Sequence, residues 1–339
     1  MEKRQLVFAL RTWQGQYASW DVPGGVKTTA TESAVYRVSE DGGELSQMKV
    51  AAPNPQFPRC SPEGRWIYFQ APAADGRWHI FRCRPDGSEE RNLTESHALG
   101  RDSFGCDFSA DGARLVYVVH DGQIGRVAVM NADGSQARIV APAIGYHYMA
   151  SFSPEGRRIV FSHTADGYRM KVMDLEGGIV ANLTPEHPES FCGRFTPDGS
   201  RIVFFRRDGD IYRVDADGKD LRRLTQGNRY GQFKISPNDA HGSSDPPSIS
   251  PDGRQVAYCA RADGAAQAHA MASDGGGQRR LTGLDGGCGR VTWSPDGRRI
   301  AFVSFVRGRP QLFVMDADGG HVAQRTDLPG AVYSLDWQP

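Results

Sequence analysis

The chain has 339 residues and a formal net charge of zero, because 40 lysine and arginine side chains balance 40 aspartate and glutamate side chains. This balance argues against a basic nucleic-acid-binding protein, and the 24% charged and 10% aromatic residues argue against disorder. The 40 glycines are about 12% of the chain, against a usual value of about 7%, and this excess predicts many turns between short strands.

The start of the chain predicts a strand over 6–10, followed by strands at 34–38 and 45–50, with a long connection over 11–33. The apolar run over 6–10 is too short for a membrane span or a signal-peptide core. The six cysteines form no CxxC pair, so we expect reduced thiols. This favours a cytoplasmic location, or a periplasmic one if an export signal was trimmed from the chain.

A four-residue phrase recurs six times after this segment, and each copy has Ser or Thr, usually Pro, then an acid and Gly. The copies begin at Ser61, Ser109, Ser153, Thr196, Ser250 and Ser294, at spacings of 48, 44, 43, 54 and 44 residues. Proline sets φ and glycine accepts a positive φ, so each copy predicts a tight turn between a first and a second strand. A third and a short fourth strand follow in each copy, and four strands in a repeat of this length predict a propeller blade.

The two ends of the chain complete the count of blades. Residues 4–50 hold only a second, third and fourth strand, whereas residues 331–339 supply a first strand. We therefore predict one all-β domain over 1–339, a seven-bladed β-propeller with four antiparallel strands per blade, closed by both termini in one composite blade. The other predicted blades span about 55–94, 103–141, 147–184, 190–225, 245–282 and 289–326.

The Ser-Pro-Asp-Gly copies, with a preceding aromatic residue and a following segment such as Ile300-Ala301-Phe302, resemble the TolB-type, WD-like propeller repeat over nearly the whole chain. This resemblance implies that the first strand of each blade lines a central channel. The turns after the first and third strands then share one end of the ring, the turn face. The remaining connections share the other end, the long-loop face. The longest of them, 11–33 and 226–247, both fall there, and such loops often carry function.

The long-loop face also collects four histidines that precede successive repeats, namely His97, His147, His187 and His241. Either they converge on a divalent metal (Mn, Zn, Ni or Fe), or they are ordinary exposed loop residues. The segment from Ala240-His241 to Gly253 gives a weaker, architectural resemblance to oligogalacturonate lyases. That resemblance implies a metal-dependent lyase, for which Lys234 and His163 are candidate bases.

A ligand can also be held by arginine and aromatic side chains. Arg59, Arg194 and Arg290 stand two or four residues before a repeat, so alternation along the strand predicts that they line the channel. With Arg229 at the mouth they can bind a carboxylate, although Arg59 can instead simply pair with Asp107. Aromatic residues that suit a sugar or peptide are expected at the same mouth: Trp13, Trp20, Tyr146, Tyr148, Phe191 and Tyr230.

These features leave two functions open. The first is a ligand- or protein-binding module that acts at the channel mouth on the long-loop face. The second is a metal-dependent carbohydrate-active enzyme, in particular a lyase that acts on an anionic, uronate-type oligosaccharide. The enzyme requires at least three of the loop histidines to converge, whereas the binding module requires only a concave mouth or an apolar patch. The expected partner is a protein or an oligosaccharide, with neither nucleic acid nor membrane insertion.

Overall fold

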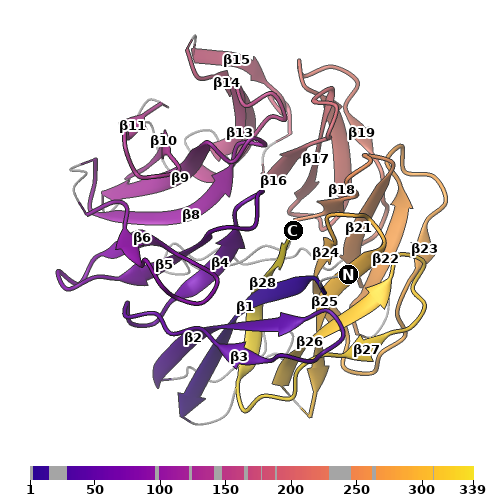
Figure 1. Cartoon of the computed structure of the whole chain (residues 1–339). Coiled ribbons are helices and arrows are strands. Elements are labelled where there is room, and N and C mark those ends of the chain that lie inside the picture. The colour runs from indigo at the N-terminus through magenta and orange to yellow at the C-terminus, as the bar shows by residue number, and fades with distance from the viewer. Residues whose placement is uncertain are drawn as a thin grey trace.

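The structure, a computed structural model, is a ring of seven four-stranded antiparallel sheets, which confirms the predicted propeller (Figure 1). It describes residues 3–14, 29–95, 99–121, 124–140, 147–163, 167–176, 178–187, 189–228, 246–261, 265–307 and 309–339. These residues form strands and turns. Within these ranges, no helix has the length and apolar character needed to cross a membrane.

The blades are numbered from the N-terminus, and the strands of each are given from the centre of the ring outwards. Blade 1 is β28 (Ala331–Gln338), β1 (Gln5–Gln14), β2 (Thr29–Ser39) and β3 (Ser46–Gln47). Blade 2 is β4 (Gln56–Cys60), β5 (Ile67–Pro72), β6 (Trp78–Cys83) and β7 (Arg91–Asn92). Blade 3 is β8 (Asp102–Phe108), β9 (Arg114–Asp121), β10 (Ile124–Asn131) and β11 (Arg138–Ile139).

The same order of strands continues through the second half of the chain. Blade 4 is β12 (His147–Phe152), β13 (Arg158–His163), β14 (Arg169–Asp174) and β15 (Gly178–Asn182). Blade 5 is β16 (Ser190–Phe195), β17 (Arg201–Arg206), β18 (Ile211–Asp215) and β19 (Arg222–Arg223). Blade 6 is β20 (Ser248–Ile249), β21 (Gln255–Ala260), β22 (Gln267–Ala272) and β23 (Arg279–Arg280). Blade 7 is β24 (Cys288–Trp293), β25 (Arg299–Val306), β26 (Arg309–Asp316) and β27 (Ala323–Gln324).

The composite blade closes the ring. β28 pairs antiparallel with β1, so that Leu6 stands opposite Trp337. One detail differs from the sequence-based expectation, because β1 continues to Gln14 and β2 begins at Thr29, with Trp13 opposite Thr31. Threonine and tryptophan favour extended backbone, so the strands run beyond the predicted 6–10 and 34–38. The connection expected over 11–33 is correspondingly shorter, and 15–28 lies outside the described residues.

The hydrophobic core lies between the blades. Each cluster of buried side chains joins two neighbouring blades, as where Phe8 of blade 1 packs with Val314 of blade 7, or Val160 of blade 4 with Phe204 of blade 5. One blade alone therefore cannot bury both faces of its sheet, and stability depends on a complete ring. All six cysteines are free thiols, and five of them are buried.

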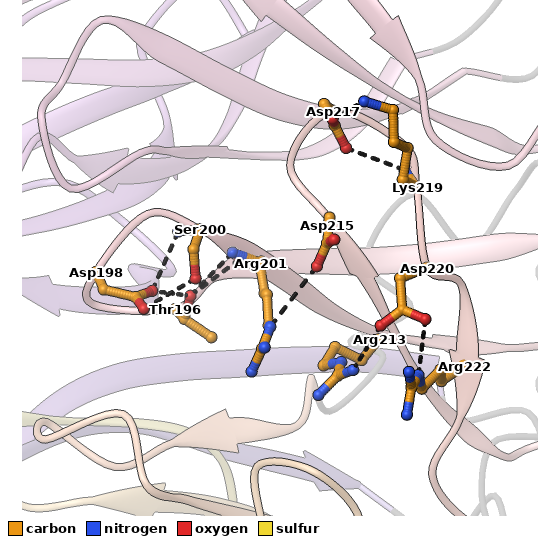
Figure 2. Close-up of polar contacts among 10 residues, drawn as sticks. All are labelled: Thr196, Asp198, Ser200, Arg201, Arg213, Asp215, Asp217, Lys219, Asp220 and Arg222. Carbon is orange, nitrogen blue, oxygen red and sulfur yellow. Dashed lines mark hydrogen bonds and ion pairs between the residues drawn. The ribbon is translucent and has the colours of Figure 1, made fainter.

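The recurring phrase forms the turn between the first and second strands of a blade, as blade 5 illustrates (Figure 2). Thr196 Oγ1 donates to Asp198 Oδ1 at 2.5 Å and accepts from the Arg201 N–H at 3.1 Å. The Asp198 carboxylate also accepts from the Ser200 N–H at 3.1 Å. Gly199 closes the turn with a φ of 71°, a left-handed conformation that favours glycine. The phrase is therefore a small hydrogen-bonded unit that positions the second strand.

These turns predict a loss of stability in acid. The hydroxyl of Thr196 holds the pKa of Asp198 below its ordinary value, and Ser109 and Ser250 act likewise on Asp111 and Asp252. A depressed folded-state pKa contributes stability that is present above the unfolded-state pKa of about 4 and is lost as the pH falls through the folded value.

We therefore expect the urea midpoint of the chain to fall below about pH 5. The Asp198→Asn/Asp252→Asn variant should lose less of its own midpoint over the same pH range, although each exposed carboxylate contributes little. A wild-type midpoint that stays constant or rises on acidification would contradict this assignment.

Arginines on the outer strands donate hydrogen bonds to the neighbouring blade at two places. Arg37 Nη1 donates to the Pro85 carbonyl of blade 2 at 3.2 Å, and Arg82 Nη1 to the Ala132 carbonyl of blade 3 at 2.9 Å. In blade 5, Arg213 instead donates to Asp220 of its own blade at 3.1 Å, and Arg222 donates to the same carboxylate at 2.8 Å (Figure 2). Asp220 therefore accepts hydrogen bonds from both arginines at the outer edge of blade 5.

Candidate functional site

Four charged side chains from four blades meet at the centre of the ring. Arg59 of β4, Asp107 of β8, Arg194 of β16 and Asp336 of β28 each stand two residues before the repeat position, so they share one level of the ring. We call this set the central belt. Arg59 Nη2 lies 3.1 Å from Asp107 Oδ1, and Arg59 Nε lies 3.7 Å from Asp336 Oδ2. Arg194 Nη1 lies 4.0 Å from Asp107 Oδ2. Arg59 therefore pairs with Asp107, which is the alternative that the sequence left open beside carboxylate binding.

The belt reaches across one blade. Blade 4 separates Asp107 from Arg194 and places the small, buried Ser151 at the same level. Because this serine is short, the Arg194 side chain can approach Asp107. β16 ends one residue after Arg194 and β4 ends one residue after Arg59, so the belt lies towards the turn face. A ligand on the long-loop face would reach it only by extending along the axis of the ring.

The four charged side chains of the belt differ in the hydrogen bonds and ion pairs that they make. Asp336 Oδ2 accepts from the Cys60 N–H at 2.9 Å, and burial raises the pKa of Asp336 although Arg59 opposes this shift. Asp336 and Asp107 both raise the pKa of Arg59. Arg194 lies 4.0 Å from Asp107 and makes no closer ion pair among the described residues. Within the described ranges, Arg194 Nη1 and Arg59 Nε are buried nitrogens without a hydrogen-bond acceptor, an unfavourable state for a charged donor.

The alternation that predicted the channel lining is interrupted in the innermost strands. β4, β8, β16 and β24 each shift register next to the residue four before the repeat. The φ angle there is 50° at Phe57, 51° at Gly105, 56° at Cys192 and 51° at Arg290. Such an extra residue is a β-bulge, which breaks the two-residue period. Arg290, which was predicted to line the channel from four residues before its repeat, occupies such a bulge, and its place in the channel lining stays a prediction.

A buried acid, Asp210, fixes the start of the connection between blades 5 and 6. It was not singled out from the sequence. Asp210 directly precedes β18 and is 1% exposed. Its carboxylate accepts from Thr225 Oγ1 at 2.8 Å, from the Gly227 N–H at 3.1 Å and from the Asn228 N–H at 3.0 Å. Arg223 also donates to it. These donors fix the backbone where the longest connection between blades begins.

Other blades place a different residue at this position. Gln267 and Gln311 stand fifteen residues before Thr282 and Thr326, as Asp210 stands before Thr225. Each glutamine accepts from the threonine hydroxyl and from a loop N–H, and its amide donates to a loop carbonyl. An ionised aspartate has no donor, so Asp210 only accepts hydrogen bonds, from the Thr225 hydroxyl and from N–H groups, and cannot bond a loop carbonyl as the two glutamines do. Aligning the blades on these threonines would have revealed Asp210 from the sequence.

Asn228 extends this anchor to the next blade. Its Nδ2 donates to the Cys259 carbonyl at 3.1 Å, and its Oδ1 accepts from the Arg261 N–H at 3.1 Å. Cys259 lies near the end of β21 and Arg261 directly follows that strand, and Asn228 is itself buried. The base of the connection is therefore fixed to both blades, and 229–245 lies outside the described residues.

The predicted histidines are placed only in part. His147 and His163 stand opposite each other in the register of β12 and β13, and Tyr148 stands opposite Ser162. His163 is buried, and the N–H of the partly buried His187 donates to the Thr184 carbonyl at 3.2 Å. In the part of the chain that the structure describes, no three His, Cys, Asp or Glu side chains are grouped to hold a metal ion. The metal site remains a prediction, and two of its four histidines lie outside that part, namely His97 and His241.

The remaining predicted residues are divided between the core and the undescribed segments. Phe191 is 6% exposed and packs against Tyr168 and Phe205, with ring centroids 5.1 and 5.7 Å away. Its ring therefore belongs to the core rather than to the channel mouth. Several other candidates lie outside the described residues: Trp20, Tyr146, Arg229, Tyr230 and Lys234.

The sequence matches a known family over most of the described blades. Residues 101–241 and 238–336 match the family model described as the TolB beta propeller domain. An uncharacterised protein of Agrobacterium fabrum is 26% identical over an alignment of 141 residues, and the match covers 38% of this chain and 46% of that protein. The chain thus spans under half of the length of this curated relative.

Solved structures share the fold at low identity. TolB from Acinetobacter baumannii has a TM-score of 0.58 and 16% identity, over 99% of this chain and 83% of its own. An oligogalacturonate lyase in complex with manganese has a TM-score of 0.60 and 16% identity, over 96% of this chain and 86% of its own, which confirms the architectural resemblance. Because the family model matches more than half of its residues, the chain belongs to the TolB beta-propeller domain family.

Proposed function

We propose that the chain is a binding module of the TolB-like class, whose ligand contacts the long-loop face around the centre of the ring. The anchor at Asp210 carries this proposal. A buried carboxylate has a high desolvation cost unless several donors satisfy it, and here the donors come from the base of the longest connection. A connection whose start is fixed in this way is better suited to a recognition surface than an insertion without function would be.

A second feature of the same face supports the proposal. The hairpin of β1 and β2 is extended to Gln14 and Thr29, so blade 1 also contributes a long connection there. The ligand is a protein segment or an oligosaccharide, and the predicted aromatic residues Trp13, Trp20 and Tyr230 would supply flat apolar surfaces for either. A metal-dependent lyase on a uronate oligosaccharide is the alternative.

Replacing 229–245 with a short Gly-Ser connection tests the proposal. A random peptide phage library and a glycan array that includes oligogalacturonates are applied to the wild type and to this variant. We expect selective binding by the wild type that the variant loses, with an unchanged unfolding midpoint, because the anchor at Asp210 and Asn228 is retained.

The matched control is Asp217→Ala/Lys219→Ala, which removes an exposed ion pair on the turn face of blade 5 (Figure 2). It should bind as the wild type does. Absence of any selective ligand for the wild type, or equal binding by the loop variant, would contradict the proposal. Selection of uronate oligomers alone, followed by their cleavage, would favour the lyase.

A further inference from the structure

Arg194 is the least compensated charge of the central belt. Its Nη1 is buried and, within the described ranges, has no hydrogen-bond acceptor, and the Asp107 carboxylate lies 4.0 Å away. Asp107 is already bonded to Arg59 at 3.1 Å. The side chains of Arg194 and Arg59 are 29% and 38% exposed, so a small group can contact their exposed atoms at the centre of the ring, whereas Arg194 Nη1 itself is buried.

The chemistry of these groups favours one class of ligand. Among the described residues, the buried belt atoms without a hydrogen-bond partner are Arg194 Nη1 and Arg59 Nε, which are both donors, whereas the two carboxylates of the belt already have partners in Arg59 and the Cys60 N–H. Blade 4 contributes Ser151 at this level, which adds no charge. A planar guanidinium with free donors matches the two oxygens of a carboxylate.

We propose that the central belt is a carboxylate-binding subsite centred on Arg194, which receives an acidic group of the ligand on the long-loop face. The nature of that ligand rests on the proposed function, whereas the subsite can be tested with a small anion alone. The Asp107 carboxylate then competes with the carboxylate of the ligand, because it already contacts both arginines.

The probes are N-acetylglycine, which carries one carboxylate, and its neutral isostere N-acetylglycinamide. Each is titrated at low ionic strength into the whole chain, and binding is followed by the arginine Nε–Hε resonances. We expect saturable binding of the acid but not of the amide. Arg194→Gln should weaken binding of the acid at least about tenfold, since hydrogen bonds to charged groups have this magnitude.

Two further variants separate recognition from a structural role. Arg222→Gln, which removes an exposed arginine paired with Asp220 at the outer edge of blade 5, should bind the acid as the wild type does. Asp107→Asn should bind it more tightly, because the competing carboxylate is removed while the shape of the side chain is kept. A purely structural belt would give no such gain.

Binding of acid and amide alike, no saturable binding, or unchanged binding by both Arg194→Gln and Asp107→Asn would overturn the subsite. If the peptide library or glycan array yields a ligand but the small acid does not bind, the subsite fails and the proposed function stands. If the acid binds as expected but no ligand is selected, the subsite stands and the proposed function fails.

Discussion

A chain that ends at Gly330, and so lacks β28, is expected not to fold. β28 is the innermost strand of blade 1, and its side chains Val332, Leu335 and Trp337 are buried. Burying such a side chain contributes about 2 kcal/mol, whereas a whole domain is stable by about 5–15 kcal/mol. Truncation would also expose the edge of β1. Far-UV circular dichroism and size-exclusion chromatography measure the loss.

A circular permutant is the matched control. It begins at Ala331, joins Pro339 to Lys3 through a short linker and ends at Gly330, so every strand is kept. Gln5 already stands opposite Gln338, and the linker therefore needs to span only a short distance. We expect this permutant to fold with a midpoint near that of the wild type. A folded truncation, or failure of both chains, would contradict closure of the ring by the composite blade.

The second large effect is expected at Asp210. Asp210→Ala removes the shared acceptor of the Thr225 hydroxyl, two loop N–H groups and Arg223. Loss of one partner from a buried charged network costs about 3–5 kcal/mol, and urea unfolding should show a decrease of this size. Asp210→Gln should recover part of it, because Gln267 and Gln311 fill the same position in blades 6 and 7.

Asp217→Ala provides the comparison within the same blade. Its carboxylate pairs with exposed Lys219, so the urea unfolding midpoint should stay close to that of the wild type. Similar losses in Asp210→Ala and Asp217→Ala would mean that the network around Asp210 does not stabilise the fold. A stable Asp210→Ala protein would also remove the main support for a fixed loop base.

The propeller was predictable because its signals are local and repeated. Each Ser-Pro-Asp-Gly phrase specifies a turn through its own side chains, as Thr196 and Asp198 do in blade 5. The strand missing at the N-terminus and the extra strand at the C-terminus specified closure. The Arg59–Asp107 pair followed from the equivalent positions of the two residues in neighbouring blades.

The sequence was less informative where distant residues decide the geometry. The bulges at Cys192 and Arg290 cannot be read from alternation, because they depend on the register with the second strand. Arg194 reaches Asp107 only because Ser151 is short in the blade between them. Phe191 looks like a mouth residue in the sequence, yet neighbouring aromatic rings enclose it in the core. Asp210 resembles an ordinary turn acid until the blades are aligned on their closing threonines.

The most direct test of the proposed binding function is an experimental structure of the chain with a peptide or glycan selected from the library or array. Our proposal predicts that the ligand lies on the long-loop face, against the connections after β1 and β19, with an acidic group directed along the ring axis towards Arg194. A ligand bound on the turn face or along the outer strands would contradict it.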